Sequence, residues 1–150
     1  MKDRVLIVDD EPDIRELLEI TLGRMSLATS SAEDLASARY LLSTEEFSLC
    51  LTDMKLPDGN GLELVEYIQQ DYNQIPVAVI TAHGTTETAI KALKSGAFDF
   101  ISKPVDLQKL RNLVTSALRL SHSNDSQNEH PSPGISTSAP TITGQSGRIV

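Results

Sequence analysis

The chain has 150 residues, a formal net charge of −8 and a single cysteine. This length suits one compact domain with an appendage. The acidic balance argues against a nucleic-acid-binding surface, because a phosphate backbone is bound by clustered lysines and arginines. The simpler interpretation of the negative net charge is that it keeps the domain soluble.

Neither a disulfide nor membrane insertion is expected. Cys50 has no partner cysteine and lies within an apolar run, where a small buried thiol is the usual interpretation. No signal-peptide pattern opens the sequence, and no apolar stretch approaches the ~18–20 residues that a membrane span requires. We therefore expect a cytoplasmic protein with no membrane partner.

Short apolar runs alternate with helical patterns over the first 120 residues. The apolar runs predict strands at 5–8, 27–30, 49–52, 77–80 and 100–102. Apolar residues at helical spacing predict helices over 12–22, 35–42, 62–68, 85–95 and 107–118.

Local signals mark several boundaries of these elements. Ser31, with Asp34 three residues on, resembles a capping box that opens the second helix. Residues 56–61 are dense in turn formers. Gly96 is placed as the C-terminal cap of the helix over 85–95. That helix carries the apolar residues Ala89, Ala92 and Leu93.

Five strand–helix units predict an α/β fold, a doubly wound five-stranded parallel sheet with helices on both faces. A flavodoxin-like winding with strand order 2-1-3-4-5 would seat the first and third strands side by side. The alternation favours this order without excluding other windings.

The composition changes at about residue 121. Ser, Thr, Pro, Asn, Gln and Gly dominate the remaining residues, with scattered aliphatics and no aromatic residue. Such a segment buries too little apolar surface to offset the entropy lost on ordering. We expect a domain over 1–120 and a disordered linker or tail over 121–150.

Polar residues follow four of the five predicted strands. They are Asp9 and Asp10, Asp53, Thr81, and Lys103 with Pro104. The carboxyl ends of parallel strands share one edge of a sheet, where open α/β sheets bind their ligands. Three carboxylates, a hydroxyl and an ammonium gathered there predict a site for a hard cation and a phosphoryl group.

Each of these residues has an expected chemical role. Asp10 and Asp53 are the best candidates for direct Mg²⁺ ligands, Asp9 binds directly or through water, and a backbone carbonyl just after Asp53 completes the set. Asp53 is also the natural nucleophile for phosphoryl transfer. Lys103 would neutralise phosphoryl charge, and Thr81 would donate its hydroxyl to a phosphoryl oxygen.

Each of these residues, taken alone, also has a purely structural interpretation. An aspartate after a strand is usually a helix cap or a turn residue, and a Lys-Pro pair can simply end a strand. The joint placement at four strand ends favours the site. Nucleotide-binding glycine loops and the G-x-S-x-G elbow of hydrolases are both absent.

Four segments carry a family resemblance. Residues 5–11 (VLIVDDE), 51–61 (LTDMKLPDGNG), 80–82 (ITA) and 96–104 (GAFDFISKP) resemble the receiver domains of two-component response regulators, in unbroken order over about 3–120. Residues 81–84 with 97–100 look most like receivers of the nitrogen-regulatory class, which activate sigma-54-dependent transcription.

The resemblance implies specific roles. Asp53 is the phosphoacceptor of a partner histidine kinase, and Asp9 and Asp10 are the acidic pair that holds Mg²⁺. Lys55 stands where the family supplies a ligating backbone carbonyl. Thr81 and Lys103 match the two residues that sense the phosphoryl group.

Two further roles follow from the resemblance. The Lys103–Pro104 peptide bond is expected to be cis, which X-Pro bonds adopt at little cost. Phe100 occupies the position of an aromatic switch, where many members have tyrosine. The hypothesis is that the phosphoryl group attracts Thr81 and that Phe100 turns inward, which remodels the surface of the fourth helix, fifth strand and fifth helix.

The resemblance also implies partners. These are a sensor histidine kinase, a second receiver in a homodimer to which Ile90 is one candidate contributor, and a downstream ATPase and DNA-binding output domain outside these 150 residues. No direct nucleic-acid contact is expected from the receiver. Beyond its own phosphorylation and dephosphorylation, the chain is expected not to be an enzyme.

Two other functions stay open. A phosphatase of the haloacid-dehalogenase type also uses Mg²⁺ and an aspartyl phosphate, but its D-x-D spacing is absent from Asp9-Asp10-Glu11. A degenerate receiver could act as a phosphate-independent docking module. The intact set of acceptor, acidic pair, hydroxyl and ammonium argues against that interpretation.

Overall fold

The computed structural model describes residues 3–82 and 85–129, with side chains described as far as His122. The elements in chain order are β1 (Arg4–Val8), α1 (Pro12–Arg24), β2 (Ala28–Ala32), α2 (Leu35–Thr44), β3 (Leu49–Asp53), β4 (Lys55–Leu56), β5 (Gly59–Asn60), α3 (Gly61–Asp71), β6 (Val77–Thr81), α4 (Thr86–Lys94), β7 (Asp99–Ser102) and α5 (Leu107–Glu129).

A five-stranded parallel sheet forms the centre of the molecule. Its strand order is β2-β1-β3-β6-β7, and all four pairings are parallel. The short β4 and β5 form a separate antiparallel pair inside the predicted turn. Counting only the sheet strands, the order is the predicted 2-1-3-4-5. The predicted fold class is therefore confirmed.

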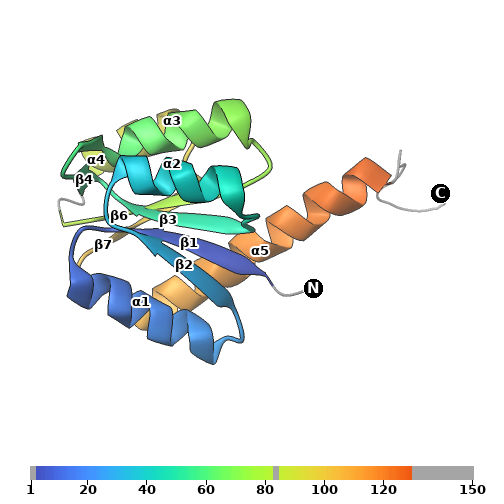
Figure 1. The fold of residues 1–150 in the computed structure, drawn as a ribbon, viewed down its shortest axis with the longest axis horizontal. Helices are drawn as coiled ribbons and strands as arrows, with labels where there is room; N and C mark the ends of the chain where they lie inside the picture. The colour runs from blue at the N-terminus through green and yellow to red at the C-terminus, as the bar shows by residue number, and fades with distance from the viewer. Residues whose placement is uncertain (1–2, 83–84, 130–150) are drawn as a thin grey trace.

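Helices cover both faces of the sheet (Figure 1). One core lies between the sheet and α2, α3 and α4, and the other lies between the sheet and α1 and α5. Along β1, Leu6 and Val8 face the first core while Val5 and Ile7 face the second. This alternation buries both sides of the strand, which is why the sequence of β1 is continuously apolar.

The start of α2 differs from the prediction. Ser31 belongs to β2, where it pairs with Ile7, so the predicted capping box does not form. Asp34 is the N-cap, and its carboxylate accepts a hydrogen bond from the Ser37 N–H. The prediction failed because β2 continues to Ala32 and takes Ser31 into the sheet.

A second aspartate completes the cap of α2 from a distant segment. Asp58, in the turn between β4 and β5, accepts hydrogen bonds from the N–H groups of Leu35 at 2.8 Å and Ala36 at 3.1 Å. These N–H groups have no partner within the helix itself. The loop that follows β3 is thereby attached to α2.

Helix α4 contacts the sheet through few side chains. Ala89 and Ala92 are buried, whereas Leu93 is exposed. Two alanines make only a narrow contact stripe against the sheet. Gly96 follows the helix with φ +111°, and its N–H donates to the Leu93 carbonyl, so its predicted capping position is confirmed.

Helix α5 is longer than predicted. Its backbone is helical to Glu129, nine residues past the expected end of the domain at 120 (Figure 1). Neither proline nor glycine occurs between Leu107 and Glu129, and extending an established helix costs little. The expected tail therefore overlaps the helix over 121–129, and residues 130–150 lie outside the described part.

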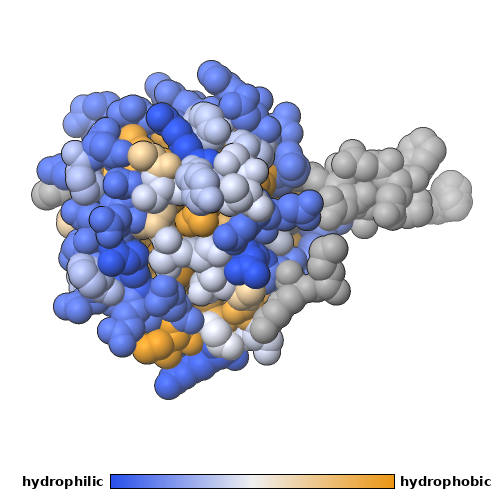
Figure 2. Space-filling model, in the orientation of Figure 1, coloured by the Kyte–Doolittle hydropathy of each residue, from blue (hydrophilic) through white to orange (hydrophobic). Residues whose placement is uncertain are grey.

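The described surface is largely polar. Figure 2 shows a mainly hydrophilic face with small separated hydrophobic spots. The large hydrophobic side chains that are exposed are Ile20, Tyr40, Ile90, Leu93 and Leu120. Among the described residues, no helix is both long and apolar enough to cross a membrane.

The Asp58 cap predicts a pH-dependent contribution to stability. The hydrogen bond from the Leu35 N–H holds the pKa of Asp58 below its usual value. A carboxylate with a lowered pKa stabilises the fold above its unfolded pKa of about 3.9 and loses this effect as pH falls through the folded pKa. Asp58→Ala should therefore lower the thermal unfolding midpoint at pH 7. The difference from wild type should shrink below about pH 4, and a pH-independent difference would contradict the cap.

Candidate functional site

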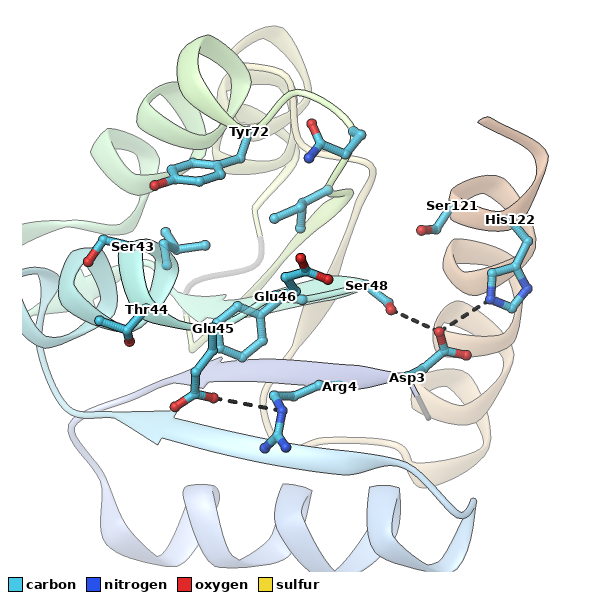
Figure 3. Close-up of a pocket in the computed structure, with 14 residues that line it drawn as sticks. Asp3, Arg4, Ser43, Thr44, Glu45, Glu46, Ser48, Tyr72, Ser121 and His122 are labelled. Atoms are coloured by element: carbon cyan, nitrogen blue, oxygen red, sulfur yellow. Dashed lines mark hydrogen bonds and ion pairs between the residues drawn. The ribbon is translucent and has the colours of Figure 1, made fainter. Parts of the chain in front are cut away.

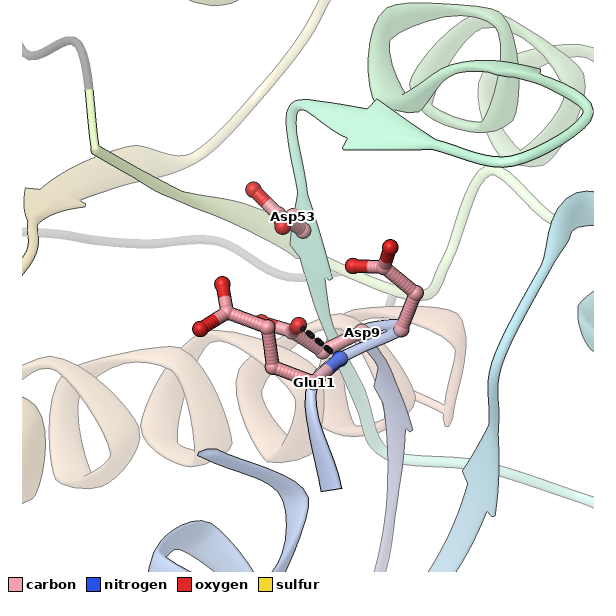
Figure 4. A group of neighbouring side chains, drawn as sticks. Asp9, Glu11 and Asp53 are labelled. Atoms are coloured by element: carbon pink, nitrogen blue, oxygen red, sulfur yellow. Dashed lines mark hydrogen bonds between the residues drawn. The ribbon is translucent and has the colours of Figure 1, made fainter. Parts of the chain in front are cut away.

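Four carboxylates meet at the carboxyl edge of the sheet. They belong to Asp9, Asp10, Glu11 and Asp53, and one oxygen of each lies within 4.8 Å of the others (Figure 4). The first three follow β1 and the fourth ends β3. These strands are neighbours, with Val8 opposite Thr52. The topology therefore brings together residues more than forty positions apart.

One ammonium faces this cluster. Lys103 directly follows β7, and its Nζ lies 2.7 Å from Glu11 Oε2, 3.1 Å from Asp9 Oδ2 and 3.2 Å from Asp53 Oδ2. Its side chain is only 10% exposed. Burial opposes the charged form, but the hydrogen bond to Glu11 and the attraction of Asp9 and Asp53 outweigh it and raise the pKa of Lys103.

Asp9 is the most deeply buried of the four acids. Its Oδ1 accepts a hydrogen bond from the Glu11 N–H at 2.9 Å, and its carbonyl accepts one from Arg15 at 2.6 Å. Its Oδ2 lies close to the Lys103 ammonium but receives no hydrogen bond of suitable geometry. Burial is the largest influence on its carboxyl and raises its pKa, although the Glu11 N–H and Lys103 act in the opposite direction.

Asp53 is held from both sides. Its Oδ1 accepts a hydrogen bond from the Met54 N–H at 2.7 Å, and its Oδ2 accepts one from Lys103 at 3.2 Å. The Thr52 hydroxyl donates to the Asp53 carbonyl at 3.0 Å. The carboxylate is thus oriented before any ligand arrives.

The first residue of α3 lies against the end of β3. The Gly61 N–H donates to the Met54 carbonyl at 2.7 Å. A Cβ atom at position 61 would lie 2.0 Å from the Asp53 carbonyl oxygen, so only glycine fits there. Gly61 therefore permits the close approach of α3 to the strand that carries Asp53.

The remaining predicted residues lie around this centre. Thr81 ends β6, is almost fully buried, and accepts a hydrogen bond at its carbonyl from the Lys103 N–H. Phe100 lies in β7, where it pairs with Val79 of β6, and its half-buried side chain packs against the first core. Lys55 begins β4 with an exposed side chain. The Lys103–Pro104 bond is cis.

Thr81 and Phe100 share one face of the sheet. Val79 and Phe100 are register partners and both belong to the first core. Thr81 lies two residues after Val79 on the same strand, so its side chain points to the same face. His83 and Gly84, which contributed to the resemblance, lie outside the described residues.

The residues at this edge fit a divalent cation. Four formal negative charges face one ammonium, so the carboxylates repel one another unless a further cation enters the cluster. Asp9 Oδ2 is a buried oxygen without a hydrogen bond, which a bound ion would satisfy. All the donors are oxygens, the set that Mg²⁺ prefers.

Sequence reasoning missed several contributors to this site. Glu11 was not among the predicted site residues, whereas its side chain reaches Lys103. Arg15 fixes the Asp9 backbone, and Gly61 accommodates the Asp53 carbonyl. Long side chains that reach across strands leave no periodic signal. The glycine-rich turn at 56–61 was the one available hint for Gly61.

A separate groove lies at the opposite edge of the sheet (Figure 3). Its volume is about 720 Å³. Asp3, just before β1, accepts a hydrogen bond from the Ser48 hydroxyl and lies 3.2 Å from His122 Nε2. Arg4 pairs with Glu45 across the groove at 3.7 Å. The groove lies at the amino ends of the strands, far from the acidic cluster.

Comparison with known proteins identifies the family. Residues 5–115 match the model of the response regulator receiver domain. The chain belongs to the response regulator receiver family. The predicted recognition of a two-component receiver is confirmed.

The similar proteins place this receiver in the nitrogen-regulatory class. The response regulator protein PilR of Pseudomonas aeruginosa is 67% identical over 119 residues, which cover 79% of this chain and 27% of PilR. The regulatory protein AtoC of Escherichia coli is 33% identical over 118 residues, which cover 79% of this chain and 26% of AtoC. Residues 11–25 resemble those of the regulator of type IV pilus transcription, and the similarity to PilR supports that recognition. The chain spans about a quarter of these relatives.

Solved structures agree with the fold. The beryllofluoride-activated receiver domain dimer of NtrC4 superimposes with a TM-score of 0.75 at 31% identity, covering 79% of this chain and 98% of that one. The sheet order and the covering helices of this receiver are therefore shared with its relatives.

The close approach at Gly61 predicts a specific loss of stability. Gly61→Ala should lower the free energy of unfolding by about 1–3 kcal/mol, because the added methyl group overpacks the Asp53 carbonyl. Gly23→Ala is the matched control: no atom lies within 4 Å of a Cβ at that position. It should leave stability unchanged or raise it by up to about 1 kcal/mol. Urea denaturation measures both, and equal effects would contradict the contact.

Proposed function

We propose that this receiver accepts a phosphoryl group on Asp53 from a phosphohistidine of a sensor histidine kinase, with Mg²⁺ bound beside it. The observation that carries the proposal is the convergence of four carboxylates and the Lys103 ammonium at one sheet edge. Asp9, Asp10 and Asp53 would hold the ion, together with the backbone carbonyl of Lys55. When bound, Mg²⁺ supplies positive charge that offsets the anionic phosphoryl oxygens.

The chemical step is a transfer between two nucleophiles. A carboxylate oxygen of Asp53 attacks phosphorus, and a new O–P bond forms as the N–P bond to the donor imidazole breaks. The bonding electron pair leaves with the imidazole. Asp53 becomes an acyl phosphate, and water later attacks the same phosphorus to restore the carboxylate. In this sense the domain assists only its own phosphorylation and dephosphorylation.

The surrounding residues would orient and sense the phosphoryl group. The Met54 N–H fixes the Asp53 carboxylate, and Lys103 supplies a mobile positive charge for a phosphoryl oxygen. The Thr81 hydroxyl would then bond a second oxygen. Its movement would allow the Phe100 ring to turn inward and remodel the surface of α4, β7 and α5.

The remodelled surface would act on partners. We propose that a transcription-activating output domain with ATPase and DNA-binding parts follows this receiver in the full protein, as in sigma-54-dependent regulators. Dimerisation is proposed because the similar solved structure is the dimer of the beryllofluoride-activated NtrC4 receiver domain. Ile90, exposed on α4, is one candidate contact. A cytoplasmic location is also proposed, because the proposed output domain would bind DNA in that compartment.

Phosphorylation at Asp53 is testable by intact mass. Incubation with Mg²⁺ and acetyl phosphate should add one phosphoryl group to the wild-type chain. Asp53→Asn should add none, because the amide is not a nucleophile at neutral pH. Omitting Mg²⁺ should also abolish the adduct. An adduct that survives in Asp53→Asn would assign the acceptor elsewhere.

The switch predicts a variant that separates chemistry from output. Thr81→Ala should be phosphorylated on Asp53 to near wild-type extent, because Thr81 senses the group rather than accepting it. Phosphorylation-dependent dimerisation, measured by analytical ultracentrifugation, should be weakened. If phosphorylated Thr81→Ala dimerises like phosphorylated wild type, the proposed coupling is wrong.

A further inference from the structure

Glu11 makes an interaction that the proposed function does not use. It is the N-cap residue of α1, yet its side chain accepts no hydrogen bond from the helix. Its carboxylate instead reaches the end of β7, where Oε2 lies 2.7 Å from Lys103 Nζ. This is the shortest of the three distances between Lys103 and its carboxylates.

Three carboxylates surround the Lys103 ammonium, and two of them accept its hydrogen bonds. Nζ donates to Glu11 and Asp53, while Asp9 Oδ2 lies 3.1 Å away as an ion-pair partner. Once a phosphoryl group is on Asp53, its oxygens compete with Glu11 for this ammonium. Glu11 is the partner released at least cost, because its side chain is 55% exposed and is readily solvated, while those of Asp9 and Asp53 are 2% and 9% exposed.

We propose that Glu11 is a positioning residue that holds Lys103 in the unphosphorylated state and thereby restrains phosphorylation of Asp53. This regulation rests on the proposed phosphoacceptor function of the same site. Removing the Glu11 contact raises the free energy of the unphosphorylated arrangement relative to the phosphorylated one. Phosphorylation should therefore become faster and a phosphoryl mimic should bind more tightly.

The first experiment measures phosphorylation rates with acetyl phosphate and saturating Mg²⁺. Glu11→Gln should react about two- to fivefold faster than wild type, the range expected for loss of a partly exposed ion pair. Asp13→Asn is the matched control, because Asp13 is an exposed acid on α1 with no described hydrogen bond or ion pair. It removes the same charge and should leave the rate near that of wild type.

Two further variants separate direct contact from general charge. Glu11→Asp keeps the charge but shortens the side chain, so it should also react faster if contact with Lys103 matters. In a Lys103→Met background, Glu11→Gln should have no further effect, because its partner is gone. A persistent acceleration in that background would show that Glu11 acts through charge repulsion of the donor, and would overturn the inference.

A binding measurement supplies a readout independent of phosphoryl transfer. Calorimetric titration of beryllofluoride in saturating Mg²⁺ should give about two- to fivefold tighter binding to Glu11→Gln than to wild type. Titration with Mg²⁺ alone should give similar affinities for both proteins. A tenfold or greater loss of Mg²⁺ affinity in Glu11→Gln would make Glu11 a metal ligand and overturn its positioning role.

The outcomes distinguish this inference from the proposed function. If wild type and Glu11→Gln both fail to become phosphorylated and both fail to bind beryllofluoride, the phosphoacceptor proposal fails. If both react and bind with equal rates and affinities, Asp53 remains the acceptor and the role assigned to Glu11 is wrong.

Discussion

The site depends on an imbalance of charge at one edge of the sheet. Four carboxylates lie within 4.8 Å of one another, and among the described residues only Lys103 neutralises them directly. Such a cluster is electrostatically unfavourable unless cations enter it. The β2-β1-β3-β6-β7 order creates it, because it places the end of β1 beside the end of β3 and leaves β7 to supply the ammonium. The fold thus concentrates negative charge where a divalent cation and a phosphoryl group can use it.

The two sides of the site differ in how firmly they are attached. The acceptor side is fixed: Met54 bonds the Asp53 carboxylate, Gly61 packs against its carbonyl, and Asp58 ties the following loop to α2. On the other side, α4 buries only two alanines and leaves Ile90 and Leu93 exposed. Sparse packing lowers the cost of local rearrangement. A rigid acceptor beside a weakly packed helix is the arrangement that a local chemical switch requires.

Much of this arrangement was predictable from the sequence. Continuous apolar runs and the polar residues that end them predicted the parallel sheet and favoured its strand order. That order seats the first strand beside the third, and so places Asp53 next to Asp9 and Asp10 at the edge that Lys103 also reaches. Two kinds of feature were not predicted: the exact boundaries of elements, and side-chain contacts between residues far apart in the sequence. Ser31 looked like a cap but continues a strand, and Asp58 caps a helix more than twenty residues before it. The Glu11–Lys103 contact spans 92 residues and leaves no trace in any window of sequence.

The most direct test of the charge imbalance is the thermal unfolding midpoint as a function of Mg²⁺ concentration. A ligand that binds only the folded chain stabilises it by RT ln(1 + [L]/Kd), so the midpoint rises as the ligand concentration exceeds Kd. The wild-type midpoint should rise steadily through the millimolar range, and Asp9→Asn should show a much smaller rise, because it removes the buried oxygen that lacks a hydrogen bond. A wild-type midpoint that does not respond to Mg²⁺, or an equal rise in both proteins, would contradict the assignment of this edge as a cation site.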